Sequence, residues 1–145
     1  MIKNTKYNSN WVIFNGVKFQ SKDEMLFYIL LLHQKKTGLI KDFTLQPKFV
    51  LIEKFTYFGI KRREVTYTPD FRIEHIDGTI ECVDVKGYGT QQGDLRRKIF
   101  EWKYPDVKLT WISRNLKHGN RDGWIEYDEL KKILRKKGKE KNERL

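Results

Sequence analysis

The chain has 145 residues, with 30 Lys or Arg against 19 Asp or Glu and a formal net charge of +11. An apolar fraction of 39%, with 14% aromatic residues, excludes a disordered chain and predicts one globular domain with a single core. The positive charge favours a polyanionic partner such as nucleic acid. The alternative is a basic protein of high solubility with no such partner.

Cysteine usage and hydropathy narrow the expected environment. Cys82 is the only cysteine, which excludes an intrachain disulfide and favours a reducing compartment. Residues 1–10 are expected to form a polar leader without the apolar core of a signal peptide. The longest apolar run, residues 25–32, is too short to span a bilayer. We therefore expect a cytoplasmic protein without a membrane partner.

The first elements are marked by turn and cap residues. Asn15-Gly16 lies between two short β-rich runs and predicts a hairpin. Ser21 and Glu24 then form a capping box that opens a helix, and Gly38 marks its end. The apolar run inside this helix predicts that it is buried on most sides and lies across a sheet.

The remaining pattern predicts an αβββαβ order. Three antiparallel strands follow the first helix, and a strand–helix–strand unit then makes its two strands parallel through a right-handed crossover. We therefore expect an α/β domain with a mixed central sheet flanked by helices over residues 1–137. A basic tail that we expect to be flexible follows at 138–145, within a terminal segment where eight basic residues face two acidic ones. The expected strands are 49–52, 65–67 leading into 71–73, 79–86 and 107–112; the later helices are 90–103 and 129–137, the last capped by Asp128.

Two aspartates in the middle of the chain are the strongest candidate site. Asp77-Gly78 predicts a tight turn, so the start of one strand, at Asp70, lies beside the end of the next, at Asp84. Lys86 follows Asp84 by two residues and points to the same face. Both aspartates could instead be solvated strand-end residues, and Lys86 an ordinary surface lysine.

Carboxylate oxygens in this arrangement favour Mg²⁺, or Mn²⁺ in its place, over Zn²⁺. The backbone carbonyl of Val85 could add another ligand. Lys86 could orient or deprotonate a metal-activated water, or stabilise a pentacovalent phosphate. Glu24 has two compatible interpretations, as a helix cap and as a carboxylate aimed at the same sheet edge.

Pro69-Asp70, followed by Asp84-Val85-Lys86, resembles the PD-(D/E)XK nuclease signature, and the αβββαβ order is the core of that superfamily. Residues 19–24, 67–71 and 83–87 are most similar to phage endonuclease I-type Holliday-junction resolvases. A group of phage and prophage nucleases with similar Gln-Pro-Lys-Phe and Asp-Val-Lys-Gly blocks matches equally well. The resemblance covers roughly residues 16–114, and it departs from the resolvases at Asp84, where they carry Glu.

The resemblance implies a restriction-endonuclease-like fold and metal-dependent hydrolysis of DNA phosphodiester bonds, selective for branched DNA. It implies that Glu24, Asp70 and Asp84 are metal-binding carboxylates and that Lys86 is the catalytic lysine. Cutting both strands of a junction implies a homodimer. Alternatives are a homing or transposon-end endonuclease, a general replication nuclease, and a non-catalytic DNA-binding module on a nuclease fold. Basic residues expected to contact the DNA backbone are Lys48, Arg96, Arg97, Lys98, Arg114 and Lys117.

Overall fold

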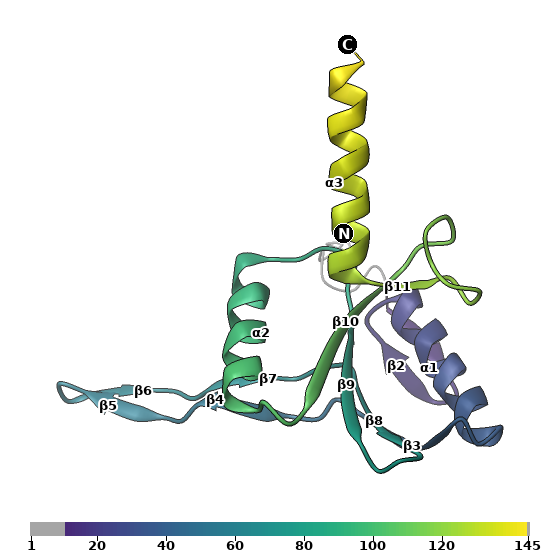
Figure 1. The fold of residues 1–145 in the computed structure, drawn as a ribbon. Coiled ribbons are helices and arrows are strands. Elements are labelled where there is room, and N and C mark those ends of the chain that lie inside the picture. The colour runs from purple at the N-terminus through teal and green to yellow at the C-terminus, as the bar shows by residue number, and fades with distance from the viewer. Residues whose placement is uncertain (1–10, 145) are drawn as a thin grey trace, which may run out of the picture.

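A computed structural model describes residues 11–144 of the chain (Figure 1). The polar leader expected at residues 1–10 lies outside this range. The helices are α1 (Lys22–Lys36), α2 (Gln91–Lys103) and α3 (Tyr127–Glu143). The strands are β1 (Val12–Phe14), β2 (Val17–Phe19), β3 (Ile40–Leu45), β4 (Phe49–Ile52), β5 (Phe55–Tyr57), β6 (Ile60–Arg62), β7 (Val65–Tyr67), β8 (Phe71–His75), β9 (Ile80–Val85), β10 (Lys108–Arg114) and β11 (Trp124–Glu126).

The centre of the fold is a five-stranded mixed sheet in the order β11-β10-β9-β8-β3. β9 and β10 are parallel and are joined through α2, whereas β3–β8, β8–β9 and β10–β11 are antiparallel. The chain therefore contains the expected α/β core, with α1, β3, β8, β9, α2 and β10 in αβββαβ order. The β8–β9 turn is the predicted one, with Gly78 at φ +87° and the Asp77 carboxylate accepting from the Thr79 amide at 3.0 Å.

Two apolar clusters hold the helices to opposite faces of this sheet. Phe27 and Leu31 of α1 pack with Phe71 and Val83 on one face. On the other, Phe100 of α2 is fully buried in a cluster with residues of β4, β7 and β10. Side chains alternate between the faces of a strand, so Val83 lies on the α1 side and Asp84 on the α2 side.

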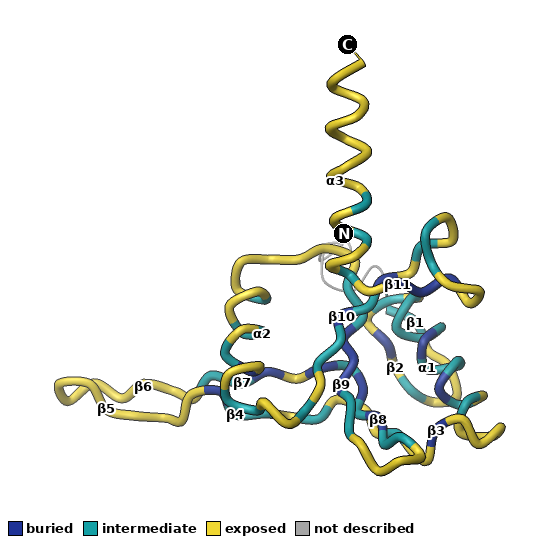
Figure 2. Tube along the Cα trace, viewed as in Figure 1, coloured by how far each residue is buried: buried dark blue, intermediate teal, exposed yellow. Residues whose placement is uncertain are grey.

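A second ribbon extends from the body on the α2 side. β4 pairs with β7, and the chain between them forms the β5–β6 hairpin, which projects away from the other elements (Figure 1). Every residue of β5 and β6 is exposed (Figure 2). We call residues 54–63 the arm.

The C-terminal helix α3 also projects from the body and has no buried residue (Figures 1 and 2). Its first turn is fixed by Arg97 of α2, whose Nη1 and Nη2 donate to the two carboxylate oxygens of Asp128 at 3.0 and 2.5 Å. The Tyr127 ring packs edge-on against Trp111, with 5.5 Å between ring centroids. The first turn of α3 is thus joined to the middle of α2 and to β10.

The structure differs from the sequence-based expectation in several elements. The first strand of the core sheet is β3, whereas 49–52 and 65–67 form the separate β4–β7 ribbon. β11 was missed, and Asp128 pairs with Arg97 instead of capping α3, whose N-cap is Glu126. Helix α3 continues to Glu143, so residues 138–143, expected as tail, are helical.

The first helix has the predicted ends but less burial than expected. The Glu24 amide donates to Ser21 Oγ at 3.1 Å, and Gly38 follows the C-cap with φ +78°. Within its apolar run only Phe27 and Leu31 are buried, because the sheet contacts one side of the helix. Among residues 11–144, no helix combines the length and apolar character needed to cross a bilayer.

Leu31→Ala should destabilise the protein by about 3 kcal/mol, because it leaves a cavity in the α1 cluster where Leu31 is only 1% exposed. Chemical denaturation measures this change. Leu134→Ala is the matched control, since Leu134 is 51% exposed on α3 and its loss should alter stability by less than about 0.5 kcal/mol. Equal effects of the two substitutions would contradict the packing described here.

Candidate active site

Asp70 and Asp84 meet at one end of the β8–β9 pair. The register pairs Phe71 with Val83, so the preceding Asp70 lies opposite Asp84. The two carboxyl groups adjoin, and burial together with the neighbouring Asp84 side chain raises the pKa of Asp70. Asp70 Oδ2 also accepts from the backbone N–H of Val85 at 2.8 Å. The backbone carbonyl of Asp70 accepts from the backbone N–H of Gln46 at 2.9 Å. These bonds fix Asp70 to β9 and to the end of β3.

Asp84 is only 6% exposed and is held by groups that the sequence did not indicate. The Tyr67 hydroxyl, at the end of β7, donates to Asp84 Oδ2 at 2.5 Å. Trp111 Nε1 donates in turn to the Tyr67 hydroxyl oxygen at 3.0 Å. Trp111 reaches this position because it is the β10 residue paired with Asp84 in the parallel ladder. The chain Trp111–Tyr67–Asp84 therefore fixes the orientation of one carboxylate oxygen.

Lys86 lies on the same face as Asp84, as predicted. Its Nζ is 3.0 Å from Asp84 Oδ2 and 4.8 Å from the centroid of the Trp111 ring. The backbone of Lys86 is bonded to β10: its N–H donates to the Ile112 carbonyl at 2.8 Å, and the Lys86 carbonyl accepts from Ser113 Oγ at 2.7 Å. The side chain remains 24% exposed, so the ammonium group is held in place yet accessible from solvent.

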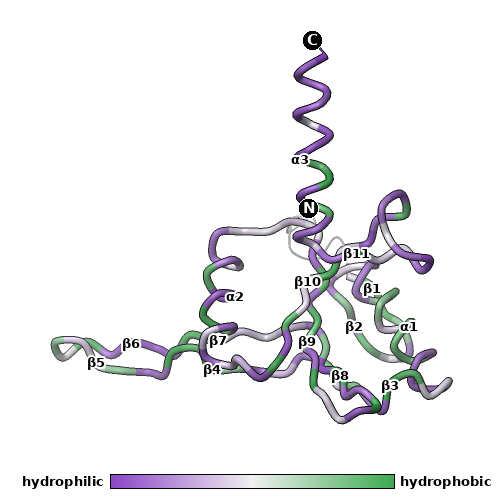
Figure 3. Tube along the Cα trace, in the orientation of Figure 1, coloured by the Kyte–Doolittle hydropathy of each residue, from purple (hydrophilic) through white to green (hydrophobic). Residues whose placement is uncertain are grey.

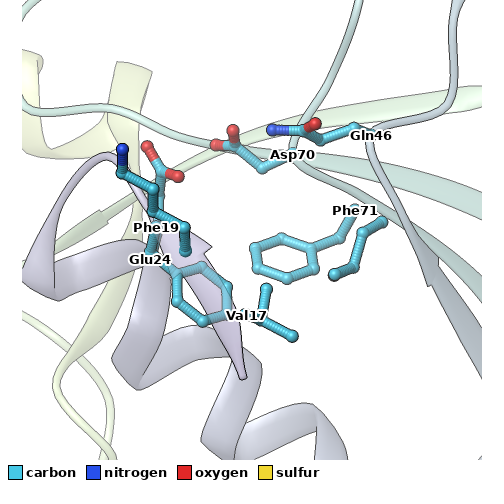
Figure 4. Close-up of a pocket in the computed structure, with 8 residues that line it drawn as sticks. Val17, Phe19, Glu24, Gln46, Asp70 and Phe71 are labelled. Carbon is cyan, nitrogen blue, oxygen red and sulfur yellow. The ribbon is translucent and has the colours of Figure 1, made fainter. Parts of the chain in front are cut away.

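Glu24 reaches the same region from the first turn of α1. A pocket of about 70 Å³ lies between Glu24 and Asp70, and both carboxylates point into it (Figure 4). The side-chain amide group of Gln46 lies beside Asp70, whereas Val17, Phe19 and Phe71 form an apolar wall of the pocket (Figure 4). Both expected interpretations of Glu24 therefore fit its position, because it lies in the capping box and its carboxylate also faces Asp70.

The electrostatics follow from burying several acids together. Loss of hydration strongly raises the pKa of Asp70, and the hydrogen bond to Asp84 and the charges of Asp84 and Glu24 add to this effect. Burial also raises the pKa of Glu24, although the hydrogen bond with the Gln20 backbone opposes it. Burial and the adjacent Asp84 charge raise the pKa of Tyr67, which keeps its hydroxyl a donor. The Lys86 ammonium group is paired with one of these acids, Asp84.

The oxygen atoms of these residues are of the type that binds a hard divalent cation, but they do not form a complete set of ligands. Asp70, Asp84 and Glu24 offer carboxylate oxygens, and their mutual repulsion is the condition that a cation relieves. The Val85 amide points at Asp70, and in a strand the carbonyl of the same residue points to that side. Within residues 11–144, however, no three His, Cys, Asp or Glu side chains lie close enough to form a metal-binding group.

The basic residues expected to contact DNA have different surroundings. Arg97 is paired with Asp128 and lies 4.5 Å from the centroid of the Trp111 ring. It therefore joins α2 to α3 and β10, and its guanidinium group is already engaged within the protein. Lys48 is exposed but 3.1 Å from Glu64. Contact with Lys117 lowers the pKa of Lys137, so two like charges adjoin beside the second half of α3. Arg96 is half-buried; Lys98, Arg114 and Lys117 are exposed.

Three site residues had no role assigned from the sequence: Tyr67, Gln46 and Trp111. Tyr67 stands three positions before Asp70, but its contact with Asp84 depends on how the β4–β7 ribbon packs on the sheet. Trp111 is a core residue at 2% exposure. Its hydrogen bond follows from the parallel register of β9 and β10, which no local signal encodes.

The comparisons with known proteins identify a family. A family described as "Protein of unknown function (DUF1064)" matches residues 4–120. The chain belongs to the DUF1064 family. That match covers Glu24, Asp70, Asp84, Lys86, Tyr67 and Trp111, so the whole candidate site lies within the DUF1064 region. No curated protein and no solved structure matches the chain.

Asp70→Asn should stabilise the metal-free protein increasingly as pH rises. The raised pKa means that stabilisation by the protonated Asp70 is complete below about pH 4 and is lost as pH rises through that pKa. An amide cannot ionise, so the variant avoids this loss. Thermal unfolding in chelator at about pH 5 and about pH 8 should show a larger advantage of the variant at the higher pH.

Asp106→Asn is the control for this comparison, because Asp106 is exposed. It should show no pH-dependent gain of this kind. An Asp70→Asn advantage that is constant with pH would contradict the clustering of acids. Added Mg²⁺ should raise the stability of the wild type more than that of Asp70→Asn, since a ligand that binds the folded state stabilises it.

Proposed function

We propose that this protein is a metal-dependent endodeoxyribonuclease that hydrolyses phosphodiester bonds. The observation that carries the proposal is the convergence of Asp70, Asp84 and Lys86 at one end of the sheet, with Glu24 facing them from α1. The αβββαβ core and the net charge of +11 support it, because an acidic centre can hold a cation while the surrounding basic surface attracts a polyanion.

Each side chain then has a separate task. Asp70 and Asp84, with Glu24, would hold Mg²⁺ or Mn²⁺, which supplies Lewis-acid activation of the attacking water and neutralises charge on the phosphate. Lys86 offers an accessible ammonium group that can bind a non-bridging phosphate oxygen and stabilise the charge gained during attack. The Tyr67 hydroxyl keeps Asp84 oriented, and Trp111 keeps Tyr67 and Lys86 in position.

The substrate we propose is branched DNA, as the similarity of residues 19–24, 67–71 and 83–87 to junction resolvases implies. One chain carries one such centre, so paired cuts on the two strands of a junction require a homodimer. We place this activity in the cytoplasm of a bacterial cell that carries a phage or prophage. A homing or transposon-end endonuclease would use the same centre on one duplex sequence.

A non-catalytic DNA-binding module is the second candidate. It is favoured by the absence of a complete metal-binding group within residues 11–144 and by the ion pair between Lys86 and Asp84. The buried acids at the sheet end weigh against it, because a binding module gains nothing from repulsion between Asp70, Asp84 and Glu24. The two candidates differ in whether Mg²⁺ or Mn²⁺ produces any cleavage.

Asp70→Asn and Lys86→Ala should each lower cleavage by at least about 100-fold while leaving salt-dependent DNA binding in place. The assay presents a four-way junction, a flap, a linear duplex and a single strand, each with Mg²⁺, with Mn²⁺ and with chelator. Paired nicks on the junction are the expected product. Cleavage of one duplex sequence only would favour the homing type of enzyme.

Matched controls are Asp106→Asn and Lys41→Ala. Asp106 lies outside the site, and Lys41 is in β3 near the end that pairs with His75, opposite to the end beside Asp70. Both should cleave like the wild type. Undiminished cutting by Asp70→Asn or Lys86→Ala would overturn the site assignment. If the wild type cuts no substrate, the non-catalytic DNA-binding module becomes the favoured function.

Tyr67→Phe should lower kcat by about tenfold with a smaller change in KM, because the ring is kept and only the hydroxyl that orients Asp84 is lost. Tyr104→Phe is the control, since the Tyr104 hydroxyl donates to the Val50 carbonyl at 2.8 Å, away from Asp84. A Tyr67→Phe variant with wild-type kcat would show that the hydroxyl does not position the carboxylate.

A further inference from the structure

The arm, residues 54–63, is a part of the described chain that neither the core nor the candidate site accounts for. β5 and β6 pair with each other and with no other strand. Phe55, Tyr57 and Ile60 are 50%, 55% and 52% exposed, and Phe58 at the tip is 89% exposed. Exposed aromatic surface of this extent needs a partner, because an isolated two-stranded hairpin gains little by its own packing.

The pairing gives the arm two different faces. Phe55 is opposite Arg62 and Tyr57 is opposite Ile60, so these four side chains share one face. Thr56 is opposite Lys61 on the other face. Both hydrophobic and hydrophilic stretches lie along the arm, with a hydrophilic run on the β6 side (Figure 3). One face is aromatic with an arginine, and the other is polar with a lysine.

Charge decides which partner this surface fits. The arm contains Lys54, Lys61, Arg62 and Arg63 but no Asp or Glu. Among residues 11–144, no ion pair engages these four cations. Two such arms meeting in a dimer would bring like charges together, which is unfavourable. Phosphate groups would instead satisfy the cations, and bases would stack on the aromatic rings.

The turn at the tip gives an independent indication. Phe58 and Gly59 have φ values of +45° and +77°, and Asn15 and Gly16 in the β1–β2 hairpin have +54° and +75°. Both turns therefore need left-handed residues, for which Asn-Gly is the favoured pair. The β1–β2 hairpin uses it, whereas the arm has a bulky aromatic residue where that conformation is strained. The Phe58 ring is thus present despite a local cost.

The two strands that carry the arm connect it to the candidate site. The ribbon that carries it, β4–β7, begins just after Gln46 and ends at Tyr67, which holds Asp84. Phe58 lies nine positions before Tyr67, a reach of about 30 Å in a strand. That length corresponds to about nine base pairs of duplex. A nucleic acid bound at the acidic site is therefore within reach of the arm.

We infer that the arm is a nucleic-acid-binding ribbon that lies along the DNA beside the candidate site, with Phe58 stacking on an unpaired or unstacked base. A two-stranded ribbon fits the major groove, and an apolar tip at a distorted step is a recurrent way to hold bent or branched DNA. Lys61 and Arg62 contact phosphates. This inference rests on the proposed DNA substrate, but it concerns binding and not cleavage.

Phe58→Asn is the decisive substitution, because Asn suits the turn and only the aromatic ring is lost. Anisotropy of a labelled four-way junction and of a perfect duplex, both in chelator so that cleavage is absent, should show affinity for the junction lowered about tenfold. The effect on the duplex should be smaller. Ile76→Asn is the matched control, since Ile76 is 62% exposed outside the arm, and it should bind like the wild type.

The double variant Lys61→Ala/Arg62→Ala tests the phosphate contacts. It should lower affinity for junction and duplex alike and reduce the slope of log K against log salt by about 2. Thermal melts identical to the wild type would exclude unfolding as the cause. Unchanged junction binding by Phe58→Asn together with an unchanged salt slope would overturn the inference. Loss of self-association in either arm variant, with DNA binding intact, would also overturn it and identify a protein interface.

The test separates this inference from the proposed activity. Weakened binding by the arm variants supports the arm even when the wild type cuts no DNA with Mg²⁺ or Mn²⁺. Cleavage by the wild type together with arm variants that bind normally overturns the arm and leaves the nuclease.

Discussion

The contact between the carboxyl groups of Asp70 and Asp84 is the constraint around which this molecule is arranged. The β8–β9 register places the two residues opposite each other, and the resulting repulsion has to be offset locally. Three groups provide this: the Val85 amide on Asp70, the Tyr67 hydroxyl on Asp84 and the Lys86 ammonium beside them. The first and third belong to adjacent residues at the end of β9, and the second comes from the end of β7, so the central sheet and the β4–β7 ribbon depend on one another at this point.

A fold that maximised its own stability would not place these groups together. Two adjoining buried acids are less favourable than a neutral hydrogen-bonded pair or an apolar contact of similar size. The same grouping becomes favourable once a cation or a positively charged group enters, which is why strongly perturbed carboxyl groups concentrate at functional sites. The raised pKa values of Asp70 and Glu24 therefore point in the same direction as the geometry.

Some of this arrangement was predictable because short-range rules determine it. The Asp77-Gly78 turn and the alternation of strand side chains were enough to bring Asp70 to Asp84 and Lys86 to the same face. The capping box likewise located Glu24 at the first turn of α1. The roles of Tyr67 and Trp111 were not predictable, since their contacts depend on ribbon packing and on a parallel register made through α2.

Errors in the strand assignment have the same origin. Residues 49–52 and 65–67 are strands, as expected, but periodicity cannot tell which sheet a strand joins. Because they pair with each other and not with β8, the hairpin between them lies off the central sheet and its apolar side chains stay exposed. The arm and the position of Tyr67 are thus consequences of one pairing. The β4–β7 ribbon carries the aromatic, basic arm at one end and the Tyr67 hydroxyl group that donates to Asp84 at the other. A ligand bound to the arm is therefore connected through one strand to the acidic site.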